Sequence, residues 1–89
     1  LCPPFVGQDA LTIVQEHVEE LIVVSDKQAI DAQRFVIERA KVLPELAASC
    51  TLAAALTIKD RFGPDDHLVL LMCGGNESVE NLVSYAQMV

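Results

Sequence analysis

The residues best suited to chemistry lie in "CGGN", directly after an unbroken apolar run. Gly74 and Gly75 allow the backbone to approach a ligand closely, and Asn76 can begin a helix whose first N–H groups face the same space. Cys73 would present a thiol to that space. Ligands bind in open α/β sheets where a strand ends in a loop that feeds a helix. These four residues are therefore candidates for ligand contact, although a glycine pair after a strand is more often only a turn.

The other cysteines and the histidines carry weaker signals. Cys2 lies in an extended opening segment, and Cys50 lies on an apolar helix, where packing is its expected role. Three cysteines without metal-ligand spacing predict reduced thiols in a cytoplasmic protein, rather than a disulfide framework or a zinc site. His17 and His67 lack neighbouring ligands, so no metal site is predicted. For Cys73 itself, burial as a small core residue is the simple alternative.

Four helices and two strands are expected to position these residues. Apolar patterns and capping residues predict helices at 10–20, 25–42, 45–63 and 77–88, and strands at 21–24 and 67–72. Both predicted strands are apolar throughout, as in parallel sheets that helices cover on both faces. The predicted fold class is α/β, as part of a three-layer αβα parallel-sheet domain with the order α-β-α-α-β-α.

Local signals predict the ends and faces of the helices. Ser25 and Gln28 form a capping-box pattern, in which each side chain accepts a hydrogen bond from the other residue's backbone N–H. Asp9 and Asn76 are predicted to cap the first and the last helix. Residues 46–56 are apolar on nearly every side, so that helix is expected to be largely buried.

Composition limits the class of protein and its partners. The chain has 89 residues, of which 52% are apolar and 21% are charged, and its net charge is −7. Scattered basic residues argue against a nucleic-acid partner. No apolar run approaches the roughly 20 residues of a membrane span. Glu77 and Glu80 suit the positive end of the last helix, and the other acidic clusters are most simply solvated surface.

The apolar surplus predicts that the chain is incomplete on its own. Small domains have much surface to cover with polar groups, and two strands form at best a marginal sheet. The expected partners are therefore the remainder of a larger α/β domain or other copies of the chain.

Several motifs follow one another along the chain in an informative order. They are "LCPPFVG", an apolar run with "VVSD", a helix ending in "AK", a glutamate that opens a small-residue helix, and "LVLLMCGGN". In this order they resemble the pyridoxal-phosphate-dependent serine/threonine ammonia-lyases, the threonine dehydratases related to serine racemases. The resemblance spans residues 1–89. It implies a single segment, the C-terminal part of a catalytic domain with the tryptophan-synthase β-like fold.

The resemblance implies roles for five residues around the cofactor pyridoxal phosphate. Cys73 would hydrogen-bond the pyridine nitrogen, Glu45 would lie beside the ring, and Gly74, Gly75 and Asn76 would shape the floor of the pocket. A thiol is a neutral partner that leaves the pyridine nitrogen unprotonated. Such a partner suits β-elimination of a hydroxyl group better than chemistry that needs a fully stabilised carbanion.

The chain also departs from the family pattern. Leu46 and Ala48 stand where the family usually has proline and glycine, which adds side-chain bulk beside the ring. The family's cofactor-binding lysine and its glycine-rich phosphate loop precede the matching segment. Lys27, Lys41 and Lys59 match neither motif, so the 89 residues by themselves are not expected to catalyse the reaction.

The implied function is deamination of L-threonine or L-serine to a 2-oxo acid and ammonia by a complete enzyme. This segment would supply the pyridine-ring side of the cofactor pocket, and the substrate would be a small amino acid. Two alternatives stay open. The segment also fits a serine racemase, and without the resemblance it fits a non-catalytic, self-associating α/β module that has no cofactor.

Overall fold

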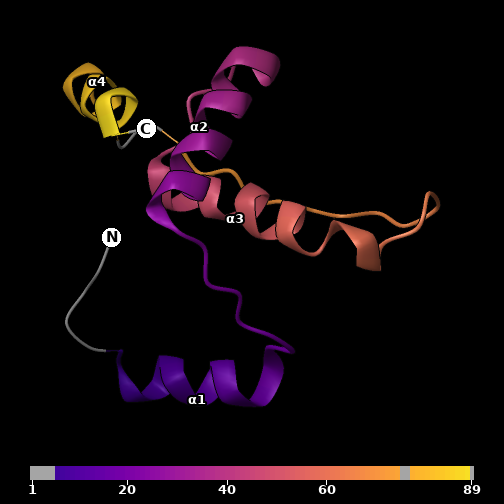
Figure 1. Cartoon of the computed structure of the whole chain (residues 1–89). Coiled ribbons are helices and arrows are strands. Elements are labelled where there is room, and N and C mark those ends of the chain that lie inside the picture. The colour runs from indigo at the N-terminus through magenta and orange to yellow at the C-terminus, as the bar shows by residue number, and fades with distance from the viewer. Residues whose placement is uncertain (1–5, 75–76, 89) are drawn as a thin grey trace.

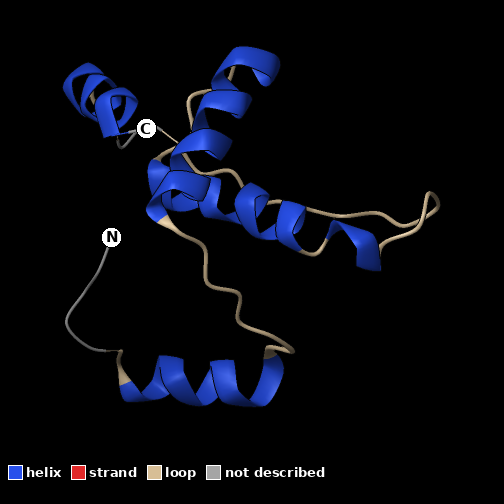
Figure 2. Cartoon of the chain, viewed as in Figure 1, coloured by secondary structure: helices blue, strands red, loops and turns tan. Residues whose placement is uncertain are grey.

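The structure is a computed structural model that describes residues 6–74 and 77–88. Within these residues the elements are all helical (Figures 1 and 2). They are α1 (Gln8–His17), α2 (Asp26–Ala40), α3 (Leu46–Thr57), the short 3₁₀ helix η1 (Lys59–Arg61) and α4 (Val79–Met88). The chain therefore keeps the expected order of helices, but it lacks the strands expected between them.

The predicted α/β fold class is wrong for the part of the chain that the structure describes. Residues 21–24 and 67–72 are not helical, but neither pairs as a strand, and no parallel sheet forms among the described residues. The one β-type pairing described is an isolated antiparallel bridge between Pro44 and Gly74. The physical reason is that a strand requires a neighbouring chain segment to complete its hydrogen bonds, and an apolar run does not provide that segment.

The core of the described residues lies where α2 packs against α3 (Figure 1). Ile30 and Gln33 on α2 are each 1% exposed, and Ser49 on α3 is fully buried. Small side chains fill most of the remaining contact, namely Ala29, Ala32, Ala48, Ala53 and Ala55. The expectation that residues 46–56 are largely buried is confirmed only for Ala48, Ser49, Ala53 and Ala55; most of the others are partly exposed, and Ala47 and Leu56 are exposed.

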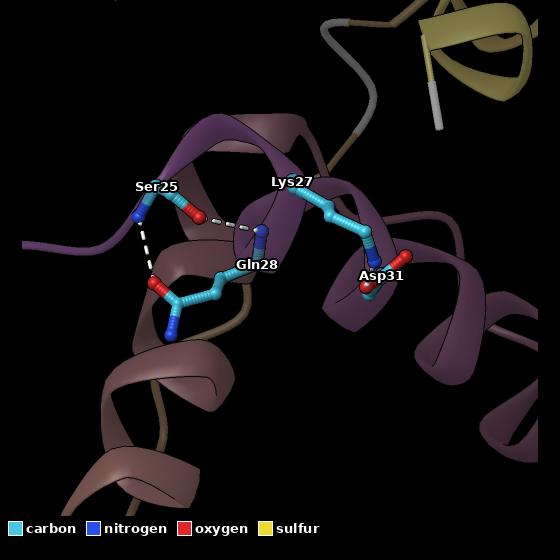
Figure 3. Close-up of polar contacts among 4 residues, drawn as sticks. All are labelled: Ser25, Lys27, Gln28 and Asp31. Carbon is cyan, nitrogen blue, oxygen red and sulfur yellow. Dashed lines mark hydrogen bonds and ion pairs between the residues drawn. The ribbon is translucent and has the colours of Figure 1, made fainter.

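Helix α2 begins with the capping box that the sequence predicts (Figure 3). The Ser25 hydroxyl accepts a hydrogen bond from the Gln28 N–H at 3.1 Å, and the Gln28 Oε1 accepts one from the Ser25 N–H at 2.8 Å. At the other end Lys41 adopts a left-handed conformation with φ of 60°. Both ends of the helix that carries most of the core are therefore defined by local interactions.

Replacing Ser25 with alanine should lower the free energy of unfolding by about 1 kcal/mol, because the Gln28 N–H loses its acceptor. Urea denaturation of the protein that carries this segment measures the effect. The matched control is Ser84→Ala, since Ser84 is exposed on α4 and makes no hydrogen bond among the described residues. Equal stabilities of the two variants would contradict a stabilising role for the capping box.

The other helix ends differ from the sequence predictions. Helix α1 has Gly7 as its N-cap, and Asp9 lies within its first turn. Helix α4 begins at Val79, and the Ser78 hydroxyl accepts a hydrogen bond from the Asn81 N–H at 3.1 Å. Ser78 thus takes the capping role predicted for Asn76, which lies outside the described residues. Helix α3 ends at Thr57, earlier than the predicted end at residue 63, and η1 follows.

Much of the apolar side-chain surface stays uncovered, as the composition predicts. The accessible surface is 7039 Å², against roughly 5,100 Å² for a compact protein of 9.7 kDa. The radius of gyration is 14.5 Å, against about 12 Å for a compact chain of this length. Helix α1 has no buried residue and lies apart from the other helices (Figure 1). In the extended segments Val23 is 93% exposed and Val69 is 89% exposed.

An exposed ion pair connects the segment after α1 with η1. The Arg61 guanidinium donates to both carboxylate oxygens of Glu20, with Nη2 lying 3.3 Å from Oε1. This hydrogen bond and the positive charge of Arg61 lower the pKa of the Glu20 carboxyl. Because both side chains are about half exposed, solvent screens the attraction.

Candidate functional site

The structure brings together two segments that carry predicted site residues. The backbone N–H of Glu45 donates to the Cys73 carbonyl oxygen at 3.0 Å. Next to this bond Pro44, which is buried, pairs with Gly74 in the antiparallel bridge. Glu45 and Cys73 are far apart in the sequence, yet they are neighbours here.

Gly74 lies so close to residue 43 that no larger residue fits. A Cβ atom built on Gly74 would lie 2.5 Å from the Leu43 carbonyl oxygen, which is a backbone atom with little freedom to move. The sequence predicts that this glycine permits the close approach of a ligand. In the structure the close neighbour is the chain itself, so Gly74 allows the turn to pack against the residues that precede α3.

The side chains of Cys73 and Glu45 form no hydrogen bond or ion pair among the described residues. The Cys73 thiol is free and exposed, so burial in the core is the wrong explanation for this cysteine. Glu45 is the N-cap of α3, but its carboxylate makes no capping hydrogen bond. The structure therefore joins Glu45, Cys73 and Gly74, while the predicted site residues Gly75 and Asn76 lie outside the described residues.

Glu77 is a residue of this region that the sequence analysis assigned only to the start of α4. One carboxylate oxygen, Oε2, accepts from the Leu46 N–H at 3.2 Å and from the Gln33 side-chain amide at 3.1 Å. The other oxygen, Oε1, accepts from the Asn81 amide at 3.1 Å and from the Tyr85 hydroxyl at 3.4 Å. The carboxylate thus connects α2, α3 and α4 directly beside the Glu45–Cys73 contact.

Two grooves lie on the surface of the described residues. A groove of about 400 Å³ runs between α2 and α3, with Asp31 and Phe35 among its lining residues. A second groove, of about 260 Å³, lies between these helices and the segment containing Leu70. Neither groove is lined by Glu45 or Cys73. Of the residues predicted to bind the cofactor, Cys73 and Gly74 are exposed and Glu45 is partly exposed.

The lysines and histidines lie on the surface. The Lys27 ammonium pairs with the Asp31 carboxylate at 2.8 Å (Figure 3), while Lys41 and Lys59 are exposed near other helix ends. His17 and His67 are exposed, and the described residues contain no cluster of three or more cysteine, histidine or acidic side chains able to hold a metal ion. None of the described helices is long and apolar enough to cross a membrane.

The residues at the Glu45–Cys73 contact fit one side of pyridoxal phosphate, the cofactor that the resemblance implies. The exposed Cys73 thiol could donate a hydrogen bond to the pyridine nitrogen of the cofactor. Glu45 contributes a carboxylate from the adjoining backbone. Both of these contacts concern the ring of the cofactor.

Comparison with known proteins identifies the family. The family model described as "Pyridoxal-phosphate dependent enzyme" matches residues 2–74. An L-threo-3-hydroxyaspartate ammonia-lyase from a Pseudomonas species is 28% identical over 78 residues, which cover 88% of this chain and 24% of that protein. A serine racemase from Schizosaccharomyces pombe is 27% identical over 79 residues, covering 89% of this chain and 24% of the racemase.

A third relative is somewhat more similar over a shorter stretch. L-threonine dehydratase catabolic TdcB from Staphylococcus aureus is 31% identical over 72 residues, covering 79% of this chain and 21% of that protein. The chain spans about a quarter of the length of these relatives. No solved structure matches it. The family model covers most of the chain, and the chain therefore belongs to the family of pyridoxal-phosphate dependent enzymes.

Proposed function

We propose that this chain is part of a pyridoxal-phosphate-dependent ammonia-lyase that converts L-threonine or L-serine to a 2-oxo acid and ammonia. Residues 1–89 would form one segment of the C-terminal part of its catalytic domain, completed by the rest of that domain or by other copies of the chain. The observation that carries the proposal is the hydrogen bond from the Glu45 N–H to the Cys73 carbonyl. It joins two of the residues to which the family resemblance assigns contacts with the cofactor.

In this proposal each residue of the contact has a separate task. The Cys73 thiol would hydrogen-bond the pyridine nitrogen, the Glu45 carboxylate would lie beside the ring, and Gly74, Gly75 and Asn76 would shape the floor of the pocket. When bound, the cofactor withdraws electrons from the α-carbon of the amino acid. Because a thiol is neutral, it leaves the pyridine nitrogen unprotonated and moderates this withdrawal. Moderate withdrawal suits the loss of a β-hydroxyl group after the α-proton has left.

A serine racemase is the second candidate, since one of the relatives is named as such. Both activities begin with removal of the α-proton, and they differ in the next step. A lyase expels the β-hydroxyl group, whereas a racemase returns a proton to the opposite face. The products therefore distinguish the two candidates.

The test uses the complete protein that contains this segment, supplied with pyridoxal phosphate. We expect 2-oxobutyrate from L-threonine and pyruvate from L-serine, with L-alanine as the control substrate because it lacks a β-hydroxyl group. D-serine as the main product from L-serine would favour the racemase. A protein that binds no pyridoxal phosphate and releases neither product would overturn the proposal and favour a non-catalytic, self-associating module. The 89 residues by themselves are expected to release no 2-oxo acid.

A further inference from the structure

The carboxylate of Glu77 supplies an acceptor for the first backbone N–H of α3. Helix N-termini expose backbone N–H groups that need acceptors, and the side chain of the N-cap residue usually supplies one. Glu45 occupies that position without accepting such a bond. Glu77 accepts from the Leu46 N–H at 3.2 Å. An N-cap side chain normally bonds to the second or third N–H of its helix, so this first N–H needs an acceptor from elsewhere. The start of α3 is therefore held by a residue beyond the turn, and the Glu45 carboxylate makes no capping bond among the described residues.

The identity of Leu46 strengthens this link. The family resemblance places proline at this position, and proline has no backbone N–H to satisfy. Leucine supplies an N–H at the first helical position. In this chain that N–H donates a hydrogen bond to the Glu77 carboxylate, so Leu46 supplies the donor and Glu77 the acceptor.

The buried side chain of Gln33 donates to the same oxygen of Glu77, Oε2, that accepts from the Leu46 N–H. The Gln33 amide nitrogen donates to Glu77 at 3.1 Å and to the Pro44 carbonyl at 3.0 Å, and Gln33 is 1% exposed. Hydrogen bonds of a buried amide are costly to break because the freed group has no water to replace its partner. Gln33 therefore holds Glu77 and the residue before Glu45 in one fixed arrangement.

The second oxygen of Glu77 is also occupied. It accepts from the Asn81 amide at 3.1 Å and from the Tyr85 hydroxyl at 3.4 Å, so the carboxylate cannot rotate without losing a partner. The pKa of the Tyr85 phenol is raised, first by burial and then by the negative charge of Glu77. Tyr85 thus keeps its proton and remains a donor.

We propose that Glu77 is a positioning residue for the cofactor site: by accepting from the Leu46 N–H and the Gln33 amide, it holds the segment that carries Glu45 against the turn that carries Cys73. This inference rests on the proposed function. Glu77 itself does not touch the cofactor. It acts by holding residues 44–46 in register with the turn that carries Cys73.

The test compares Glu77→Leu, Glu77→Gln and Glu80→Leu in the complete protein. The first variant removes both acceptors. The second keeps one carbonyl oxygen for the Leu46 N–H and the Gln33 amide, so it should restore most of the function. Glu80→Leu is the matched control, since it removes the same charge from the exposed first turn of α4, where Glu80 has no partner among the described residues.

Two measurements separate positioning from general stability. The first is the dissociation constant of pyridoxal phosphate, from a titration followed by absorbance and fluorescence. We expect it to rise about tenfold or more in Glu77→Leu, to stay within about threefold of wild type in Glu77→Gln, and to be unchanged in Glu80→Leu. The second is amide hydrogen exchange without cofactor. In Glu77→Leu the Leu46 amide should lose protection because its acceptor is gone, while the Ala53 amide, in the middle of α3, should keep its protection.

The outcomes separate this inference from the function on which it rests. If the wild-type protein binds no pyridoxal phosphate, the proposed function is wrong and the inference falls with it. If the wild-type protein binds the cofactor and Glu77→Leu binds it equally well, the inference alone is wrong. If Glu77→Leu does not fold, Glu77→Asp replaces it, because its carboxylate is one methylene too short to reach Leu46. A wild-type dissociation constant in the folded aspartate variant likewise overturns the inference.

Discussion

Replacing Gly74 with alanine is expected to lower the free energy of unfolding by roughly 1–3 kcal/mol and to weaken cofactor binding at the same time. The added Cβ would lie 2.5 Å from the Leu43 carbonyl oxygen, so one of the two backbone segments must move. Movement there stretches the hydrogen bond from the Glu45 N–H to the Cys73 carbonyl, which is 3.0 Å in the structure. The substitution therefore separates the two segments that carry the candidate site.

Urea denaturation of the complete protein measures the loss of stability in Gly74→Ala, and a pyridoxal phosphate titration measures the loss of cofactor affinity. Gly63→Ala is the matched control, because a Cβ there has only the Asp66 carboxylate at 3.7 Å, an ordinary contact. We expect that control to keep wild-type stability and affinity. Unchanged stability in Gly74→Ala would mean that residues 43 and 74 are not packed as described.

Replacing Cys73 with alanine should lower the turnover of the complete enzyme about tenfold or more, because the ring nitrogen loses its hydrogen-bonding partner. Stability should hardly change, since the thiol is exposed and packs against no core. Cys73→Ser should keep much of the activity, as a hydroxyl is also a neutral donor and acceptor. Steady-state rates with L-threonine and the absorbance spectrum of the bound cofactor provide the measurement.

A second cysteine supplies the control for this experiment. Cys50 is half-buried on α3, where its thiol lies 3.7 Å from the Leu46 carbonyl oxygen. Cys50→Ala should lower stability slightly and leave the cofactor spectrum unchanged. If Cys73→Ala left both the spectrum and the turnover at wild-type values, the role assigned to Cys73 would be wrong.

The features that sequence reasoning predicted correctly depend on residues close together in the chain. The capping box needs only Ser25 and Gln28, three positions apart, and the structure forms both of its hydrogen bonds. The partial burial of α3, at Ala48, Ser49, Ala53 and Ala55, follows from the small residues in its sequence. The family could also be predicted from the sequence, because the resemblance depends on the order of motifs along the chain rather than on their arrangement in space.

The features that sequence reasoning missed depend on partners far along the chain. The apolar runs at 21–24 and 67–72 predict strands, but no described segment pairs with them. Glu77 contacts Leu46 and Gln33, and nothing near Glu77 in the sequence indicates either contact. One signal was present, since Gln33 follows Ile30 by three positions and is thus a polar residue on the apolar face of α2. A buried amide on such a face requires hydrogen-bonding partners.

The uncovered apolar segments have a consequence for how the chain behaves in solution. Val23 and Val69 project from unpaired extended backbone, which is the kind of surface that seeds intermolecular β-pairing. At neutral pH the net charge of −7 keeps neighbouring molecules apart through mutual repulsion. That repulsion vanishes near the isoelectric point of about 4.5. The colloidal stability of the isolated chain therefore depends on its acidic side chains, and mild acidification or high salt should precipitate it.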